Sequence, residues 1–351
     1  MDLSKAFDCI PHDLLIAKLH AYGFSKEALT YIYSYLKGRK QRVKIDNFES
    51  ELLELLSGVP EGSILGPIIF NIFINDLFMF IKNANLHGFA DDHTLSASER
   101  TQSKLIEILS KESGIALDWL TDNHMIANPT KFQAIILKKS KESTDITLQI
   151  KDKTIQSKQH VKLLGVTIDD KLNFDKHIGD ICSRAGGQLN SLYRMCKFMS
   201  PKTIKAAINS FVMSNFNYCP LTWHFTTAKS KNKIEKIQER ALKLSNCSNN
   251  QDTCTMEIGR LKIICIEIYK TLNGLNPSYM KSIFQKPINR TSKRLRYNIY
   301  SAKHYQTNFG SRSLRVLGPQ IWNKLPEDIK RADSLQTFKR LINKFHGIQS
   351  N

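Results

Sequence analysis

Paired cysteines are missing from this chain of 351 residues. Its seven cysteines are an odd number, they are scattered along the sequence, and none forms a Cys-x-x-Cys pair. Such spacing argues against a zinc site and gives no disulfide framework. A reducing compartment therefore fits the cysteine content best.

Long apolar runs are missing as well. The N-terminus carries no apolar signal segment, and the most apolar run, residues 64–81, contains Pro67, Asn71, Asn75 and Asp76. Such a run is a poor membrane span and a good buried helix. We therefore expect an intracellular protein, cytoplasmic or nuclear and not secreted, with no membrane partner.

Acidic residues are scarce in the second half only. Residues 1–170 carry 20 Lys and Arg against 22 Asp and Glu, whereas residues 171–351 carry 31 against 10. The net charge of +19 is therefore a property of the second half, which by itself carries +21. This asymmetry favours a polyanionic partner, above all nucleic acid, over a basic surface that only keeps the protein soluble.

Apolar periodicity predicts a mixed first half and a helical second half. In the first half, helices are expected over 11–22, 25–35, 65–81 and 101–123, and strands over 41–46, 51–56, 86–89, 93–97, 134–137, 146–150 and 161–168. In the second half, helices are expected over 174–198, 201–215, 229–244, 261–272 and 334–345. The first half lacks the regular alternation of a doubly wound sheet, so the expected class is α+β.

The most informative stretch is Phe89-Ala90-Asp91-Asp92, which places two adjacent carboxylates at the tip of a predicted hairpin. Such carboxylates either face water as ordinary turn residues or hold a divalent cation. A second pair, Asp169-Asp170, has no such context, so the pair alone does not decide between the two interpretations. A third carboxylate is available at Asp2.

Five motifs follow one another in the first half. They are Asp2–Asp8, Gly58–Pro67, Phe89–Asp92, Asn128–Phe132 and Lys162–Val166. In this order they resemble the palm of a reverse transcriptase from a non-LTR (LINE-type, Jockey-like) retrotransposon. One such motif is a weak signal, but five in register form a specific set. The second half is similar to the C-terminal region of such elements at residues 216–223, 238–242 and 317–322.

The resemblance implies an α+β fold with the right-hand architecture of polymerases. Residues 1–168 would form a palm, an antiparallel sheet with packed helices. Residues 169–245 would form a helical thumb-like region, and residues 246–351 a basic C-terminal region of unknown role. The chain would begin one residue before its first catalytic Asp, with the fingers missing. This is expected of an N-terminally truncated element or an incomplete gene model.

The implied activity is that of an RNA-directed DNA polymerase, which extends a primer 3′-OH by two-metal nucleotidyl transfer. The implied partners are an RNA template, a DNA primer and deoxynucleoside triphosphates. The implied cofactors are two Mg²⁺ ions, with Mn²⁺ as an alternative, held by Asp2, Asp91 and Asp92. Lys131 would donate a proton to pyrophosphate, although a solvated turn lysine suits its position equally well. The alternative function is that of a catalytically inactive truncated remnant that only binds nucleic acid.

Further site residues follow from the same resemblance. Phe7 would crowd the ribose 2′ carbon, and a core role at a helix start is also open to it. A turn would pack against the template base and incoming nucleotide, or serve only as a turn; its residues are Gly58, Pro60, Glu61, Gly62 and Ser63. The family usually has Gln where Glu61 stands, and a carboxylate there repels phosphates unless it points away.

Two further nucleic-acid contacts are implied. Leu163, Leu164 and Gly165 would lie in a hairpin that grips the primer end. A basic and aromatic patch of Arg294, Arg296 and Tyr297 would add contact to nucleic acid.

Overall fold

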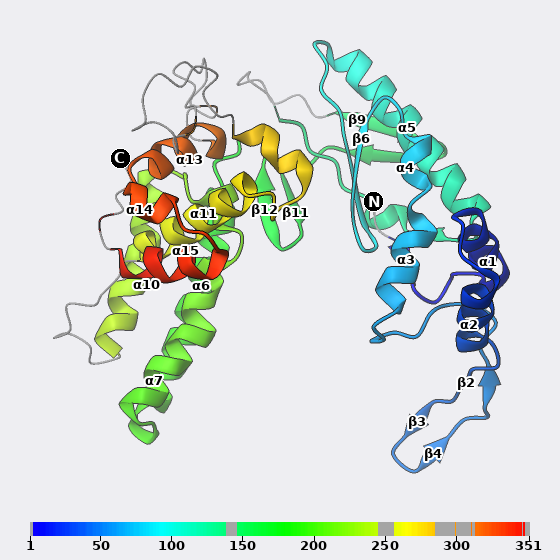
Figure 1. The fold of residues 1–351 in the computed structure, drawn as a ribbon, viewed down its shortest axis with the longest axis horizontal. Coiled ribbons are helices and arrows are strands. Elements are labelled where there is room, and N and C mark those ends of the chain that lie inside the picture. Colours follow the sequence, from blue (N-terminus) through cyan, green and yellow to red (C-terminus); the bar gives the residue numbers. More distant parts are fainter. Residues whose placement is uncertain are drawn as a thin grey trace. The chain divides into compact units, whose positions relative to one another are not determined.

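The computed structural model describes residues 3–137, 146–244, 256–284, 299, 310, 313–345 and 347. The chain divides into two compact units, the first of residues 1–136 and 142–159 and the second of residues 137–141 and 160–351 (Figure 1). Small antiparallel sheets and many helices make up the described residues, which confirms the mixed class of helices and strands. Among these residues, no helix is long and apolar enough to cross a bilayer.

The helices of the first unit largely follow the predicted apolar stripes. They are α1 (His12–Ala21), α2 (Lys26–Leu36), α3 (Gly66–Ile74), α4 (Leu77–Phe80) and α5 (Gln102–Asp122). Ser25 caps α2, because its hydroxyl accepts a 3.3 Å hydrogen bond from the amide of Ala28.

The single helix predicted over 65–81 is wrong, because the chain breaks between α3 and α4. Lys18 of α1 binds the chain at this break. Its ammonium donates to the carbonyl oxygen of Phe73 at 3.0 Å and to Asp76 Oδ1 at 2.9 Å. The Phe73 carbonyl is the acceptor that a continuing helix would offer to the amide of Leu77. A cation from another helix therefore competes with the next turn.

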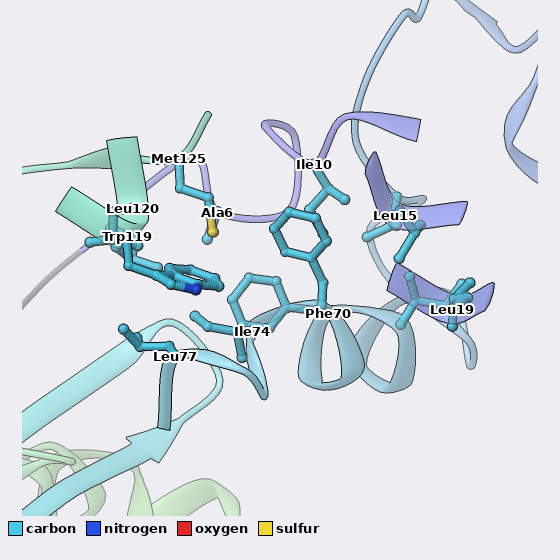
Figure 2. Packing of buried hydrophobic residues seen from close by; sticks show 14 of the residues in the cluster. Ala6, Ile10, Leu15, Leu19, Phe70, Ile74, Leu77, Trp119, Leu120 and Met125 are labelled. Carbon is cyan, nitrogen blue, oxygen red and sulfur yellow. The ribbon is translucent and has the colours of Figure 1, made fainter. Parts of the chain in front are cut away.

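The core of the first unit gathers side chains from the loop after β1 (Leu3–Ser4) and from α1, α3, α4 and α5 (Figure 2). Leu15, Leu19, Phe70 and Phe73 are completely buried. Each such side chain contributes about 1.5–3 kcal/mol to folding. The core therefore fixes the chain on both sides of the loop that follows β1.

The strands of the first unit pair two by two, and several of these pairs are hairpins. β1 pairs with β8 (Ile126–Ala127), and β6 (Asn85–Phe89) pairs with β7 (Asp92–Ser96). The hairpin of β9 (Thr147–Ile150) and β10 (Lys153–Gln156) contacts α5. The strand predicted over 134–137 is reduced to one bridge between Ala134 and Ser157.

The strand predicted over 41–46 is also divided. β2 (Lys40–Gln41) pairs with β5 (Leu53–Glu54), which lies in the strand predicted over 51–56, while β3 (Lys44–Ile45) turns back onto β4 (Phe48–Glu49). The turn uses Asp46, whose φ is +51°. Val43 and Ile45 remain 63% and 67% exposed. The apolar side chains that predicted this strand are therefore not buried in the described structure.

Residues 160–169 of the second unit form a hairpin, as the family resemblance implied for Leu163 to Gly165. The apolar pattern predicted a single strand over 161–168 and missed the turn. β11 (His160–Leu163) and β12 (Val166–Asp169) are joined by Leu164 and Gly165, whose φ values are +45° and +82°. Two successive positive φ values are typical of the tight turn that suits strand twist.

Two helical cores follow in the second unit. The first lies among α6 (Asp175–Met195), η2 (Cys196–Phe198), α7 (Pro201–Ala207), η3 (Ile208–Met213), α8 (Ser214–Asn217), α9 (Pro220–Trp223) and α10 (Ala228–Leu244). The second lies among α11 (Met256–Leu272), η4 (Ser278–Ile283), α13 (Leu314–Asn323), α14 (Glu327–Lys330) and α15 (Leu335–Lys344). The predicted helices are confirmed, whereas α13 and α14 were not expected from the pattern.

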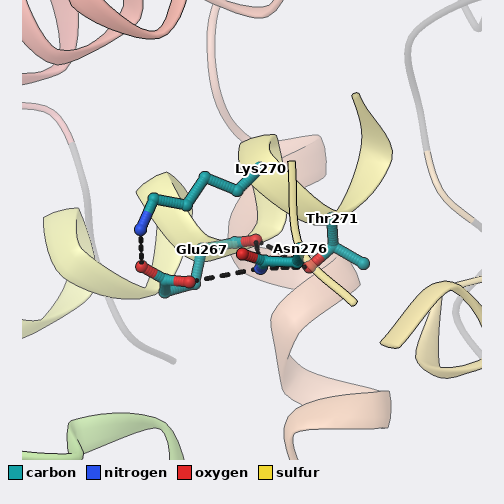
Figure 3. A network of polar contacts seen from close by, with 4 residues as sticks. All are labelled: Glu267, Lys270, Thr271 and Asn276. Atoms are coloured by element: carbon teal, nitrogen blue, oxygen red, sulfur yellow. Dashed lines mark hydrogen bonds and ion pairs between the residues drawn. The ribbon is translucent and has the colours of Figure 1, made fainter. Parts of the chain in front are cut away.

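A polar network holds the chain where it leaves α11 (Figure 3). Asn276 donates to the carbonyl oxygen and Oε2 of Glu267 and to the hydroxyl of Thr271, at 3.0–3.3 Å. Lys270 donates to the other oxygen of the Glu267 carboxylate at 2.6 Å. These bonds fix Asn276, and with it the chain just beyond α11, against the last two turns of the helix.

Candidate functional site

The Asp91-Asp92 pair lies at the tip of a β-hairpin, as predicted. Phe89 of β6 pairs with Asp92 of β7, so the loop consists of Ala90 and Asp91 alone. Ala90 has a φ of +51°, a left-handed conformation that is uncommon for alanine. Asp91 is half-buried and Asp92 is exposed. The strained turn thus presents two adjacent carboxylates, and backbone strain of this kind is concentrated at functional sites.

His93 supports the hairpin from within. It is only 4% exposed, and its Nδ1 donates to the carbonyl oxygen of Asp91 at 3.1 Å. Burial lowers the pKa of this imidazole below its ordinary value. A Cβ added to Gly88 would lie 3.1 Å from the Phe78 ring and 3.3 Å from the His93 ring. The hairpin is therefore packed closely where it meets α4.

Glu112 ties the start of the hairpin to α5, and sequence reasoning missed it. This carboxylate is 1% exposed and accepts hydrogen bonds from the amides of Lys82 and Asn83 and from the Asn83 side chain, at 2.6–3.2 Å. Burial raises its pKa, but these hydrogen bonds outweigh burial and hold the pKa below the ordinary value. The available signal was a charged residue within the apolar stripe of the helix.

Asp2, the predicted third carboxylate, lies outside the described residues. β1 begins at the next residue and is held by β8, whereas β6 and β7 form a two-stranded sheet of their own. Among the described residues, no group of three His, Cys, Asp or Glu side chains could hold a metal ion. The described donors, Asp91 and Asp92, supply the hard oxygen atoms that Mg²⁺ prefers.

The second Asp-Asp pair differs in its surroundings. Asp169 is 7% exposed and accepts hydrogen bonds from the amides of Lys171, Asn173 and Phe174 at 2.6–3.1 Å. This carboxylate therefore fixes the turn before α6. Asp169 is therefore a structural aspartate, unlike the pair at the tip of the β6–β7 hairpin.

Two predicted segments, Phe7 and the turn that begins at Gly58, are joined through their backbones. Gly58 donates to the carbonyl oxygen of Ile10, and Val59 donates to that of Phe7, both at 2.8 Å. The Ser57 hydroxyl donates to the carbonyl oxygen of Asp8 at 2.8 Å. The structure thus brings together residues that lie fifty positions apart in the sequence.

Phe7 itself has a clear packing role. Its ring stacks on that of Phe70, with centroids 4.8 Å apart, and its side chain is half-buried. The core role that the sequence left open is therefore present, and the exposed part of the ring remains available to a ligand.

The turn of residues 60–63 is exposed at its apex and anchored at its end. Glu61 and Gly62 are exposed, and Gly62 has a φ of +71°. The Ser63 hydroxyl donates to the Pro60 carbonyl oxygen at 2.7 Å and accepts from the Gly66 amide at 3.0 Å. Ser63 therefore provides an acceptor for the first amide of α3, whereas the side chain of Glu61 extends into solvent.

The other predicted residues belong to elements other than the β6–β7 hairpin. Lys131 is exposed at the end of a single helical turn, η1 (Pro129–Lys131). Leu163, Leu164 and Gly165 belong to the second unit, where the Tyr218 hydroxyl donates to the Leu164 carbonyl oxygen at 2.7 Å. The patch of Arg294, Arg296 and Tyr297 lies outside the described residues.

Known proteins match this chain. The probable RNA-directed DNA polymerase from transposon BS of Drosophila melanogaster is 24% identical over 259 residues, which cover 70% of this chain and 28% of that protein. The RNA-directed DNA polymerase from mobile element jockey of the same fly is 26% identical over 262 residues, covering 69% of this chain and 27% of that protein. For the probable polymerase from transposon X-element the identity is 23% over 258 residues, with coverage of 70% and 27%.

The chain thus spans somewhat more than a quarter of the length of these relatives. Residues 1–168 match the family described as reverse transcriptase (RNA-dependent DNA polymerase). Through these residues the chain belongs to the reverse transcriptase family, and it is related to the polymerases of the BS, X-element and jockey non-LTR retrotransposons.

Proposed function

We propose that residues 1–168 are the palm of an RNA-directed DNA polymerase, which extends a primer 3′-OH on an RNA template. The observation that carries this proposal is the carboxylate pair Asp91-Asp92 at a strained two-residue hairpin tip. The pair lies within the segment that matches the reverse transcriptase family. In the same proposal, the helices of residues 169–245 are the thumb.

The donor chemistry of the hairpin fits a divalent cation. Asp91 and Asp92 offer carboxylate oxygens, and Asp2 would complete the ligand set from the residue before β1. When bound, a pair of Mg²⁺ ions stabilises the charge on the attacking 3′-oxygen and on the leaving pyrophosphate. Mn²⁺ prefers similar oxygen ligands. The role of the chain itself is to hold these carboxylates in place.

Two parts of the first unit position the reacting groups in this proposal. The segment of residues 57–59 donates hydrogen bonds to backbone carbonyl oxygens of the loop of residues 7–10, and it would present a close, rigid surface to the incoming nucleotide. Phe7, braced by Phe70, would crowd the sugar. Lys131 would hold or donate a proton at the pyrophosphate. The exposed position of Glu61 lets its carboxylate turn away from phosphates.

The second unit would hold nucleic acid. The Leu163–Gly165 hairpin, secured by Tyr218, would contact the primer end. The excess of Lys and Arg in the second half supports phosphate contacts to an RNA template and a DNA primer.

Primer extension tests the proposal. The full chain is incubated with deoxynucleoside triphosphates, Mg²⁺ and a DNA primer annealed to an RNA template. Extension by the wild-type chain that is lost in Asp91→Ala supports a polymerase.

The same charge excess carries a second candidate, a non-catalytic nucleic-acid-binding protein. Salt-sensitive RNA binding without any extension would favour this second candidate, because phosphate contacts weaken steeply as salt rises. The absence of both activities at low salt would contradict both candidates.

A further inference from the structure

A long stretch of the second unit has no acidic residues. Between Asp180 and Glu235 the sequence contains eight Lys and Arg and no Asp or Glu. This stretch runs from α6 to the first turns of α10. With no carboxylates in the same segment to offset them, these cations favour an anionic partner.

Four of the cations surround the turn between α6 and α7. Arg194, Lys197, Lys202 and Lys205 are all exposed. Among the ion pairs of the described residues, none involves these four side chains. We call residues 193–205 the α6–α7 tip; α7 lies at one end of the second unit (Figure 1).

Large aromatic side chains accompany these cations. Tyr193 is 69% exposed and Phe198 is 90% exposed, the highest value among the large apolar side chains that the structure describes. Scattered exposed apolar residues are ordinary. Here, however, two aromatic rings flank two cations within a segment of six residues, Tyr193-Arg194-Met195-Cys196-Lys197-Phe198.

The backbone of the α6–α7 tip is held by packed and capped residues, so the exposure of the two rings is not the result of a loose segment. Leu192 and Ile204 are 8% and 9% exposed and belong to the first helical core of the unit. Ser200 caps α7 by accepting a 3.2 Å hydrogen bond from the Thr203 amide, and Pro201 occupies the first turn. These contacts fix the turn while Tyr193 and Phe198 remain outside the core.

We propose that the α6–α7 tip binds a single-stranded segment of nucleic acid, with Tyr193 and Phe198 stacking on bases and the four cations contacting phosphates. Exposed rings among cations are the combination that holds single strands, since every base has a face for stacking. In a duplex the base faces are already stacked on each other, so the rings have nothing to cover. This surface goes beyond the proposed polymerase, for which only phosphate contacts were assigned to the helices of residues 169–245, and it does not depend on catalysis.

Fluorescence anisotropy with labelled oligouridylate tests the α6–α7 tip in the full chain. The double variant Y193A/F198A should bind this single strand about 25-fold more weakly, at about fivefold for each stacked ring. Its affinity for the same strand annealed to oligoadenylate should stay within about twofold of wild type. Tyr279→Ala is the matched control, because Tyr279 is 72% exposed in the same unit and should leave both affinities unchanged.

A charge variant gives an independent readout. R194Q/K197Q/K202Q should reduce the slope of log affinity against log salt by about 2, since each lost phosphate contact on a single strand removes about 0.7. K339Q/R340Q/K344Q removes three exposed cations of α15 and should leave the slope unchanged. Thermal unfolding of each variant shows whether its fold is intact.

Three outcomes would overturn the proposal. In the first, Y193A/F198A binds the single strand as tightly as Tyr279→Ala does. In the second, it loses single strand and duplex equally. In the third, the wild type binds vesicles of phosphatidylserine and phosphatidylcholine more tightly than RNA and loses that binding in Y193A/F198A. The last result would assign the α6–α7 tip to an anionic membrane surface. Loss of extension in Asp91→Ala is a separate readout, so the two proposals fail separately.

Discussion

Replacing Gly58 with alanine should disrupt the backbone contact that joins the turn at residues 58–63 to the loop after β1. Gly58 has a φ of +86°, and a Cβ added there would lie 2.8 Å from Asp8 Cα, 2.8 Å from Asp8 O and 2.9 Å from Phe7 O. All three are backbone atoms, so no side-chain rotation relieves the clash. The segment carrying Phe7 would have to move.

The expected loss of stability has two parts. The left-handed conformation costs alanine about 1–2 kcal/mol. Forcing a methyl group into a filled space costs about 1–3 kcal/mol more. Gly58→Ala should therefore lower the free energy of unfolding by about 2–5 kcal/mol.

Gly62→Ala is the matched control. Gly62 lies in the same turn with a φ of +71°, and an added Cβ would have no atom within 4 Å. This variant should bear only the conformational cost of about 1–2 kcal/mol. Urea denaturation of both variants, at an unchanged slope of free energy against urea, measures the difference. Equal losses in the two variants would refute the close approach of Gly58 to residues 7 and 8.

Three other predictions concern contacts that support the two units. Glu112→Ala leaves the amide donors of residues 82 and 83 without their buried acceptor. It should therefore lower the free energy of unfolding by about 2–4 kcal/mol and speed hydrogen exchange in β6 and β7. Glu107 is exposed on the same helix, and Glu107→Ala should have neither effect. Tyr218→Phe removes the hydrogen bond to the Leu164 carbonyl oxygen and should lower the free energy of unfolding by about 0.5–1.5 kcal/mol, and an unchanged value would argue against that bond. Burial lowers the pKa of His224 to about 3, so the stability due to its neutral form is complete above about pH 6.5 and is lost as pH falls towards 3. Denaturation at pH 5 and pH 7 should therefore show a loss of about 2 kcal/mol from this group, and His224→Gln should show a smaller loss than the wild type.

Local pattern was sufficient for much of the fold. The helices over 11–22, 25–35, 101–123 and 174–198 follow their apolar stripes, and Ser25 caps its helix as its position suggested. Asp91 and Asp92 were predicted at a hairpin tip because strands were expected on both sides of them, and the hairpin is present. These features depend on neighbours in the sequence, which is why pattern reasoning reaches them.

Features that depend on distant residues were not predictable in this way. The break after α3 involves Lys18, and the closeness of Gly58 to Phe7 involves hydrogen bonds across fifty residues. The apolar pattern missed the turn that divides 161–168, which only the family resemblance implied, because the turn uses Leu164 at positive φ and no local preference of leucine favours that conformation. The role of Glu112 also becomes clear only when the chain around Asn83 is present.

The central claim is that the Asp91-Asp92 hairpin is the catalytic tip of an RNA-directed DNA polymerase. Mg²⁺-dependent primer extension on an RNA template, with Asp91→Asn compared with Asp152→Asn, tests it most directly. Asp152 is the matched control because its side chain is 82% exposed in a different hairpin of the same unit. We expect extension by the wild type and by Asp152→Asn and none by Asp91→Asn. Extension that survives in Asp91→Asn, or none by the wild type despite salt-sensitive RNA binding, would contradict the claim.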